Sequence, residues 1–369
     1  MKTVLISGAG VAGPALAYWL HRHGFAPTVV ERAPTLRAGG HAVDVRGVAL
    51  DVIERMGLTG PLRRARTEMR GMSMVDQDGT EIMRSTEMAL SSGRLDSADV
   101  EALREDLVGL LYDATRAGVR YCFGDSVTAL DQDRDGVRAT FDRAAPETFD
   151  LVVGADGLHS TVRRLAFGPE EPYLHHLGAY VGVFTAPNFL DLDRWQVWLR
   201  ADGVGYGIYS ARDNTQLRVN LGFESGPLDY DRRDADAQRK LIEERLHGVG
   251  WETERLLAAM WQSTDFYFDA MAQIRMDSWS AGRVTLLGDA GYCPSPLSGQ
   301  GTSLALVGAY VLADALARHG GDYVAGFEDY ERRMRQFVTL NQALATENPG
   351  GPPSDESAER AKSAIDLDA

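Results

Sequence analysis

The chain has 369 residues, 44% of them hydrophobic and 25% charged, the balance of a globular protein with two or three sub-structures. Its net charge of −15, without Lys/Arg clusters beyond short pairs, argues against nucleic acid as a partner, and no run of about eighteen apolar residues predicts a membrane span. The two cysteines, Cys122 and Cys293, are too few for a disulfide framework, so we expect a reducing, cytoplasmic compartment.

The first predicted unit is a strand, a glycine-rich turn, a helix and a second strand. A β-branched strand over 3–7 leads into Gly8-Ala9-Gly10-Val11-Ala12-Gly13, a helix is expected over 14–23, and a strand over 27–30 ends at Glu31. The glycines have the spacing G-x-G-x-x-G. A lone match is weak, but these elements in this order indicate a dinucleotide site.

Each residue of this motif has a physical role in the prediction. Gly8 allows the tight turn, Gly10 lets the backbone approach a pyrophosphate, and Gly13 lets helix and strand pack closely. The N-terminus of the helix presents unpaired N–H groups to the phosphates, and Glu31 is placed to accept from ribose hydroxyls. The alternatives are a glycine-rich turn without function and a secretory signal, whose apolar core the glycines would interrupt.

Further along the chain, the hydrophobic pattern changes from helix to sheet and back. Apolar positions within 97–117 recur at helical spacing and predict one helix. Alternating runs rich in aromatic and β-branched residues over 173–223 predict an antiparallel sheet. Helices are expected at 234–247 and 252–260, and the segment 266–276 should return to the sheet.

Two more glycine-containing turns follow predicted strands. Asp156-Gly157 lies in GADGLHSTVR, between a strand and a helix, and Asp289 ends the buried strand that precedes the loop GDAGYCPSPLSGQ. A long helix begins at Gly301, where backbone N–H groups can stabilise negative charge developing on a bound ring. Asp289 is placed to accept from sugar hydroxyls.

Together these three motifs resemble the fingerprints of the group A FAD-dependent aromatic monooxygenases, the fold typified by p-hydroxybenzoate hydroxylase. Their order and separations match up to about Asn341. The segments GGHAVDVRG and SPLSGQGTSLALVGAYVLA are most similar to the tetracycline-inactivating branch and its actinobacterial antibiotic-pathway relatives. The chain departs from the family in having Gly291-Tyr292 in place of Ala-His, and Ser303 in place of Asn.

The resemblance implies an α/β protein: a Rossmann-like (GR2-type) FAD-binding domain with an inserted antiparallel-sheet substrate domain and a C-terminal helix pair. The expected FAD-binding domain is discontinuous, at 1–70, 97–170 and 277–320, and the substrate-binding β-sheet domain takes up 71–96 and 171–276. The C-terminal helix is expected at 321–345, followed by a mobile tail at 346–369 in which 357–365 form a short helix.

The resemblance also assigns cofactor contacts. Glu31 would bind the adenosine ribose, Arg104 the phosphate or ribityl region, and Asp289 the ribityl chain or pyrophosphate. Asp156 would contact both FAD and NAD(P)H, and the backbone of Val127 the adenine. The full set of predicted cofactor-binding residues is Gly8, Gly10, Ala12, Gly13, Glu31, Arg32, Arg46, Arg104, Val127, Asp156, Asp289, Gly301 and Thr302.

The implied activity is that of a monooxygenase. Non-covalent FAD, reduced by transiently bound NAD(P)H, would react with O₂ to a C4a-(hydro)peroxide that hydroxylates an aromatic or polyketide-type small molecule. Baeyer–Villiger oxygenation in the same pocket and a non-catalytic, FAD-holding ligand-binding protein are the alternatives. We assign no catalytic side chain, find no spacing typical of a metal site, and leave the oligomeric state open.

The substrate is expected beneath the sheet, facing the flavin. Aromatic residues on a sheet are more often core than ligand contacts, so polar Asn220 is the most informative candidate. The candidate substrate residues are Trp198, Tyr206, Tyr209, Asn220, Phe266 and Pro296. The pair His175-His176 is expected at the surface or a sheet edge, and Cys293 as a small buried filler.

Overall fold

The computed structural model describes residues 1–37, 39–91, 93–348 and 353–369. Its strands are β1 (Thr3–Ser7), β2 (Ala26–Glu31), β3 (Ala42–Val45), β4 (Gly71–Val75), β5 (Glu81–Ser85), β6 (Met88–Ala89), β7 (Gly93–Arg94), β8 (Val100–Leu103), β9 (Arg120–Phe123), β10 (Val127–Gln132), β11 (Val137–Phe141), β12 (Glu147–Phe149), β13 (Leu151–Gly154), β14 (Leu174–Pro187), β15 (Trp195–Ala201), β16 (Val204–Ala211), β17 (Gln216–Glu224), β18 (Tyr267–Ile274), β19 (Ser280–Ala281) and β20 (Val284–Leu286). Its helices are α1 (Ala12–Arg22), α2 (Val48–Arg55), α3 (Thr59–Arg64), α4 (Arg104–Asp113), α5 (Thr161–Phe167), α6 (Ala235–Leu246), α7 (Thr253–Gln262), α8 (Asp289–Tyr292), α9 (Gly301–Arg318), α10 (Tyr323–Glu347) and α11 (Asp355–Lys362), with a 3₁₀ turn at Pro296–Ser298.

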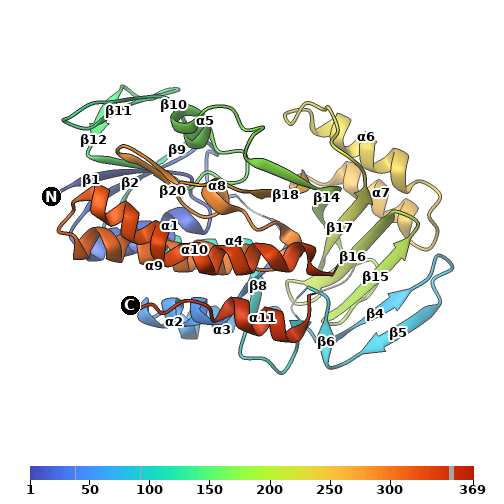
Figure 1. The fold of residues 1–369 in the computed structure, drawn as a ribbon. Helices are drawn as coiled ribbons and strands as arrows, with labels where there is room; N and C mark the ends of the chain where they lie inside the picture. The colour runs from blue at the N-terminus through green and yellow to red at the C-terminus, as the bar shows by residue number, and fades with distance from the viewer. Residues whose placement is uncertain (38, 92, 349–352) are drawn as a thin grey trace.

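The first layer is a six-stranded sheet in the order β19-β20-β13-β1-β2-β9, parallel except for the β19–β20 pair. Helices α1, α9 and α10 lie on one side of it, and α5 with the small sheet β10-β11-β12 on the other (Figure 1). Because both faces are covered, β1 and β13 are continuous apolar runs, and Val4, Leu5 and Ile6 are fully buried.

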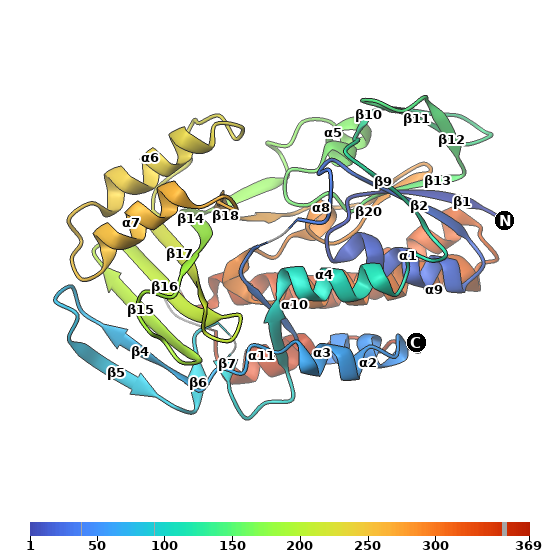
Figure 2. The ribbon, with the colours of Figure 1, turned by 180° about the vertical axis from the view of Figure 1, so that it is seen from behind.

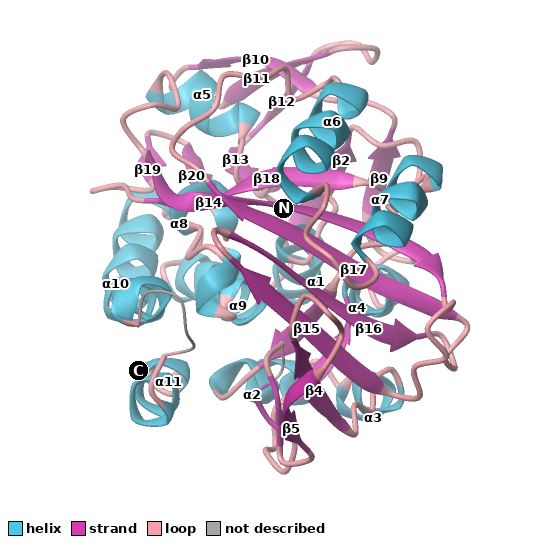
Figure 3. Cartoon of the chain, turned by 90° about the vertical axis from the view of Figure 1, so that its right-hand side faces the viewer, coloured by secondary structure: helices cyan, strands magenta, loops and turns pink. Residues whose placement is uncertain are grey.

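The second layer is a seven-stranded sheet in the order β18-β14-β17-β16-β15-β4-β5. Helices α6 and α7 cover its outer face, and the other face looks toward the first layer (Figure 2, Figure 3). Strands β4 and β5, far from β14–β18 in sequence, join this sheet through the parallel pair β4–β15. None of the helices in the described ranges is long and apolar enough to span a bilayer.

The predicted single helix over 97–117 is wrong at its start. Val100–Leu103 form strand β8, paired with β3, and helix α4 begins only at Arg104. The apolar positions fit either structure, and the tertiary partner β3 decides between them, because an unpaired β3 would leave its backbone groups unsatisfied.

The C-terminal segment also differs from the sequence prediction. Residues 353–369 include helix α11 and pack onto the protein instead of forming a mobile tail; 349–352 lie outside the described residues. Ala361 and Leu367 are buried, and Asp368 accepts two hydrogen bonds from Arg55 at 2.8 Å. The acidic, proline-rich composition of the tail favoured the prediction of mobility, because the few apolar and charged residues that pack onto the protein do not stand out in it.

Candidate active site

A cavity of about 2030 Å³ lies between the two sheets. The first motif, the turns after β13 and β20, and the start of α9 line it from the first layer. The inner face of the seven-stranded sheet lines the opposite side. We call the side formed by the first layer the floor of the cavity and the side formed by the seven-stranded sheet its roof. With the exception of Gly13, every predicted cofactor and substrate residue contributes to this lining.

The glycines of the first motif do three different things. Gly8 has φ +109°, and a Cβ there would collide with the carbonyl of Ala155, which directly follows β13. A Cβ on Gly13 would overlap the carbonyl oxygen of Gly8, so this glycine lets α1 pack against the turn. Around Gly10 the nearest atom is Arg104 Nη2, 3.9 Å away, which leaves its backbone open to the cavity.

Glu31 holds the motif together while facing the cavity. Its two carboxylate oxygens accept from the backbone N–H groups of Ala9 and Ala33, each at 2.9 Å. Each oxygen retains a second lone pair for a ligand hydroxyl. The neighbouring Arg32 is exposed at the cavity rim, and Val127 is a buried part of the lining.

Arg104 is a half-buried cation whose guanidinium has no hydrogen-bond or ion-pair partner in the part of the chain that the structure describes. Its burial lowers its pKa, and the positive charge of Arg37 acts in the same direction. A cation withdrawn from water needs a counter-charge, and Arg104 lies beside the open backbone of Gly10. This pairing fits a bound diphosphate.

Asp156 caps the N-terminus of α5. Its carboxylate accepts from Ser160 Oγ and from the backbone N–H groups of Thr161 and Val162 at 2.9 and 3.1 Å, with Ser7 Oγ at 3.5 Å. These bonds occupy part of the carboxylate, the residue lines the cavity, and its contact with cofactors stays a prediction. Burial raises its pKa.

The third motif brings Asp289 and the start of α9 together. Gly301, with Asp289 Oδ1 3.7 Å from the position of its missing Cβ, and Thr302 open α9 with unpaired N–H groups. Sequence reasoning missed Gln300, which is fully buried and whose two amide side-chain atoms have no partner within the described ranges. A polar side chain between Gly299 and Gly301 was the signal available.

A pair of buried acids lies behind Arg46. Asp44 on β3 faces Glu101 on β8, and Arg46 Nη2 donates to Asp44 Oδ2 at 2.8 Å. Burial raises the pKa of Asp44 to about 7, with Arg46 opposing this shift and Glu101 adding to it. Arg46 Nε is buried without a partner in the described structure, and Gly299 lies beside its guanidinium. Neither acid was predicted from the sequence.

The roof of the cavity is one face of the seven-stranded sheet. Trp198, Gly207, Asn220 and Val183 lie opposite one another on four adjacent strands, so they share this face. The ring of Trp198 covers the place where a Cβ of Gly207 would be. Tyr209, two residues along on the same face, accepts from the N–H of Ala42 at 2.5 Å, which ties the roof to β3.

Two predicted substrate residues of the lining also have ring contacts on the side of α6 and α7. The ring of Tyr206 stacks on Trp251, and Thr253 Oγ1 donates to its hydroxyl at 3.1 Å on the side of α7. The ring of Phe266 lies under the guanidinium of Arg239 on α6. Tyr206 is one residue from Gly207, so the two alternate between the faces of β16, and the contact of Tyr206 with substrate stays a prediction. Pro296 lines the cavity from the loop before α9.

The cavity wall also contains residues that the sequence analysis did not select. Tyr267 and Asp269 of β18 face the cavity, as does His159 beside the Asp156-Gly157 turn. Lys362 of α11 pairs with Asp99 at 2.9 Å and closes another part of the wall. These residues come from segments without a motif, so only the folded chain brings them together.

The remaining predictions near the cavity concern His175, His176 and Cys293. His175 is exposed on β14, and His176 is half-buried. Cys293 is buried, and burial raises the pKa of its thiol well above the usual value, which keeps it neutral. In the described part of the chain, no three His, Cys, Asp or Glu side chains gather in a metal-binding arrangement.

The unsatisfied groups on the floor of the cavity match one kind of ligand. The open Gly10 backbone and the unpaired Arg104 suit a diphosphate, and Glu31 and Asp289 suit ribose or polyol hydroxyls. The Gln300 amide and the N–H groups that open α9 suit the polar edge of a planar ring. A diphosphate, polyol hydroxyls and a planar ring with a polar edge are the parts of FAD.

Comparison with known proteins agrees with this donor set. Residues 1–342 match the family model described as "FAD binding domain". "Uncharacterized protein Rv1260" of Mycobacterium tuberculosis is 54% identical over 354 residues, which cover 96% of this chain and 95% of the relative. A "Flavin-dependent monooxygenase" of Legionella longbeachae is 41% identical over 339 residues, 92% of this chain and 86% of the relative.

A solved structure extends the likeness to the whole fold. The crystal structure of tetracycline destructase Tet(55) is 37% identical and superimposes with a TM-score of 0.88, over 100% of this chain and 98% of that chain. The cavity, both sheets and the C-terminal helices therefore belong to a shared architecture.

Proposed function

The chain belongs to the FAD-binding-domain family and is a flavoprotein monooxygenase; from that premise, we propose that it takes reducing equivalents from NAD(P)H and inserts one oxygen atom from O₂ into an aromatic or polyketide-type small molecule. The observation that carries this proposal is the cavity. Its volume of about 2030 Å³ is about twice the roughly 1,000 Å³ upper end for a single small-molecule site. It has room for a dinucleotide and a second molecule together.

FAD, when bound, supplies the redox chemistry, and the chain supplies position, charge and dryness. Arg104 and the N–H groups that open α1 would hold the diphosphate. Glu31 and Asp289 would accept from the ribose and ribityl hydroxyls. Gln300 and the N–H groups at Gly301 would orient the ring and stabilise negative charge on it.

The second molecule would lie between that ring and the roof. Trp198 offers an aromatic face and Asn220 a polar amide on the same sheet face, and Gly207 leaves space between them. An aromatic surface with a single polar anchor fits a flat, oxygen-rich ring system. The relative Tet(55), a tetracycline destructase by name, supports this substrate class.

A substrate panel tests the proposal. The purified protein should be yellow, and phenols, tetracyclines or other polyketides should increase its NADPH consumption and give a product heavier by one oxygen atom. A colourless protein that takes up no added FAD would contradict the flavin site. NADPH consumption without a gain of oxygen in any product would contradict the monooxygenase activity on this panel.

A pair of variants tests the cofactor residues. Asp289→Ala should lower FAD occupancy severely because it removes the acceptor beside α9, whereas His175→Ala, at an exposed position of β14, should retain it. The measurement is the ratio of flavin to protein absorbance after gel filtration. Equal occupancy in the two variants would show that Asp289 does not bind the cofactor.

A further inference from the structure

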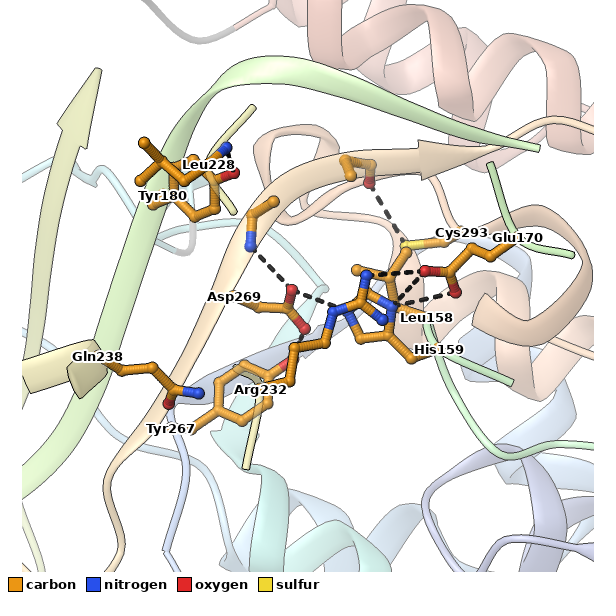
Figure 4. Close-up of polar contacts among 12 residues, drawn as sticks. Leu158, His159, Glu170, Tyr180, Leu228, Arg232, Gln238, Tyr267, Asp269 and Cys293 are labelled. Carbon is orange, nitrogen blue, oxygen red and sulfur yellow. Dashed lines mark hydrogen bonds and ion pairs between the residues drawn. The ribbon is translucent and has the colours of Figure 1, made fainter. Parts of the chain in front are cut away.

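A second polar cluster lies at the boundary between the two layers, around His159 (Figure 4). Its Nδ1 lies 2.9 and 3.0 Å from the two carboxylate oxygens of Glu170, and its Nε2 lies 3.0 Å from Asp269 Oδ1. Glu170 follows α5 in the first layer, whereas Asp269 belongs to β18 of the seven-stranded sheet. The imidazole therefore bridges the two layers.

This geometry determines the protonation of the ring. An ionised carboxylate only accepts hydrogen bonds, so a bridge to Glu170 and Asp269 needs a proton on both ring nitrogens of His159. Burial alone would lower the pKa of His159, but hydrogen bonds and charge from Asp269 and Glu170 outweigh it and raise the pKa above its usual value. The bridging form is the imidazolium.

The surrounding groups hold Glu170 ionised. Arg163 donates to Glu170 at 2.6 Å and Arg232 donates to it at 2.9 Å. Burial alone would raise the pKa of Glu170, but the hydrogen bond and charge of His159 and the charges of Arg232 and Arg163 lower it below its usual value. Arg163 also donates to the carbonyl oxygen of Ala290 at 2.8 Å, which connects the cluster to the third motif. Cys293, close by, stays a neutral thiol.

Asp269 also connects the His159 cluster to the cavity wall. The hydroxyl of Tyr267 donates to Asp269 Oδ2 at 2.6 Å, and the residue, 46% exposed, forms part of the cavity wall. The protein that surrounds the hydroxyl and the charge of Asp269 raise the pKa of Tyr267 well above its usual value, so it remains a donor. The position of this ring therefore depends on where Asp269 is held.

We propose that His159 is a positioning residue that latches the seven-stranded sheet to the flavin layer in its imidazolium form, and that it thereby fixes Tyr267 in the wall that retains FAD. The inference rests on the FAD site proposed above. On deprotonation, one ring nitrogen presents a lone pair to a carboxylate, and one of the two bridges is lost.

The direction of the pH effect follows from the raised pKa of His159. A group with a raised pKa contributes its full stabilisation below its usual value and loses it as the pH rises through the raised one. Tyr267 and Cys293, whose pKa values are raised well above their usual values, stay neutral throughout this range. The latch should therefore open on the alkaline side.

Release of FAD measures the latch without any substrate. The holoprotein is diluted into buffers from pH 6 to pH 9, and the rise of flavin fluorescence gives the dissociation rate. We expect the rate to increase about tenfold across this range in the wild type, the scale of one lost charge-assisted hydrogen bond. His159→Gln should release FAD quickly and equally at every pH, and the matched control His175→Gln should behave as the wild type.

A spectroscopic measurement detects the imidazolium directly and does not need a variant that folds. In wild-type holoprotein labelled with ¹⁵N-histidine, His159 should show two protonated ring nitrogens at pH 7 and lose one at alkaline pH. A neutral His159 at pH 7, or a wild-type release rate independent of pH, would overturn the latch. A protein with the expected NMR signals that binds no FAD would instead contradict the proposed function.

Discussion

The floor and the roof of the cavity are built by different means. The floor uses glycines, backbone N–H groups and a few charged side chains that lie close to glycine-containing turns, such as Glu31 and Asp289. The roof uses side chains on one face of the seven-stranded sheet, such as Trp198 and Asn220. Turn chemistry is visible in the sequence, whereas a one-residue shift along a strand moves a side chain to the opposite face.

This difference predicts how the two regions tolerate change. A substitution in the floor alters backbone packing or removes a contact to the common cofactor, so it should affect folding or FAD binding. A substitution on the roof leaves the backbone of the sheet in place, so it should alter the choice of substrate. Four tests, ordered by expected effect, examine this division.

Gly13→Ala should have the largest effect, because the new Cβ would overlap the carbonyl oxygen of Gly8 between two rigid backbone segments. We expect a loss of about 3 kcal/mol in the free energy of unfolding, measured in urea. The control is Gly24→Ala, where φ is +82° but no atom lies within 4 Å, and the expected cost is about 1 kcal/mol. Equal losses would show that the floor is not close-packed at Gly13.

Arg104→Met should separate cofactor binding from stability. Loss of a charged hydrogen-bond donor to the diphosphate should weaken FAD binding about 10- to 100-fold in a fluorescence titration. The FAD-free protein should be at least as stable as the wild type, because an unpaired, half-buried charge has been removed. Arg32→Met, at the exposed rim, is the control. A similar loss of affinity in this variant would contradict the assignment of Arg104 to the diphosphate.

Asp44→Asn tests strand β3, which Tyr209 connects to the seven-stranded sheet. Because the pKa of Asp44 is raised to about 7, the folded wild type keeps a proton that the unfolded chain has lost, and its stability falls between about pH 4 and pH 7. From pH 5 to pH 8, the difference in unfolding free energy should move in favour of the variant by about 2–3 kcal/mol. Parallel curves for the two proteins would mean that Asp44 is ionised throughout.

A pair of roof variants should have the smallest effect on stability and the clearest effect on function. Tyr206→Phe removes the hydroxyl that contacts Thr253; we expect a loss of about 1 kcal/mol in stability and an unchanged KM. Asn220→Leu, on the cavity face, should retain stability and raise the KM for the best substrate of the panel about tenfold. The reverse pattern would show that the two faces of the sheet have been interchanged.

The sequence predicted more of the floor than of the roof. The first motif lies where its spacing placed it, and Gly8, Gly10 and Gly13 each have the predicted environment. At Asp156, which lines the cavity, the carboxylate also caps α5, a contact that the sequence analysis did not predict. Motif position gives proximity, but the hydrogen-bond partners of a side chain depend on the local turn.

On the roof, the facing of a strand separates residues that look alike in the sequence. Tyr206 and Tyr209 both line the cavity from β16, but the ring of Tyr206 stacks on Trp251, whereas the hydroxyl of Tyr209 accepts from the N–H of Ala42 on β3. Both are aromatic and buried, so composition could not separate them. His159 and Asp269 are 110 residues apart in the chain and meet only because the two layers pack against each other.

The sequence by itself determined the family, the cofactor class and the position of the dinucleotide turn, because glycine geometry and helix N-termini act over a few residues. The tertiary structure alone decided which face of the seven-stranded sheet lines the cavity, that α11 packs instead of moving freely, and that Gln300 and Arg104 lie unpaired where a ligand would meet them. These outcomes depend on contacts between distant segments, and no local pattern encodes them.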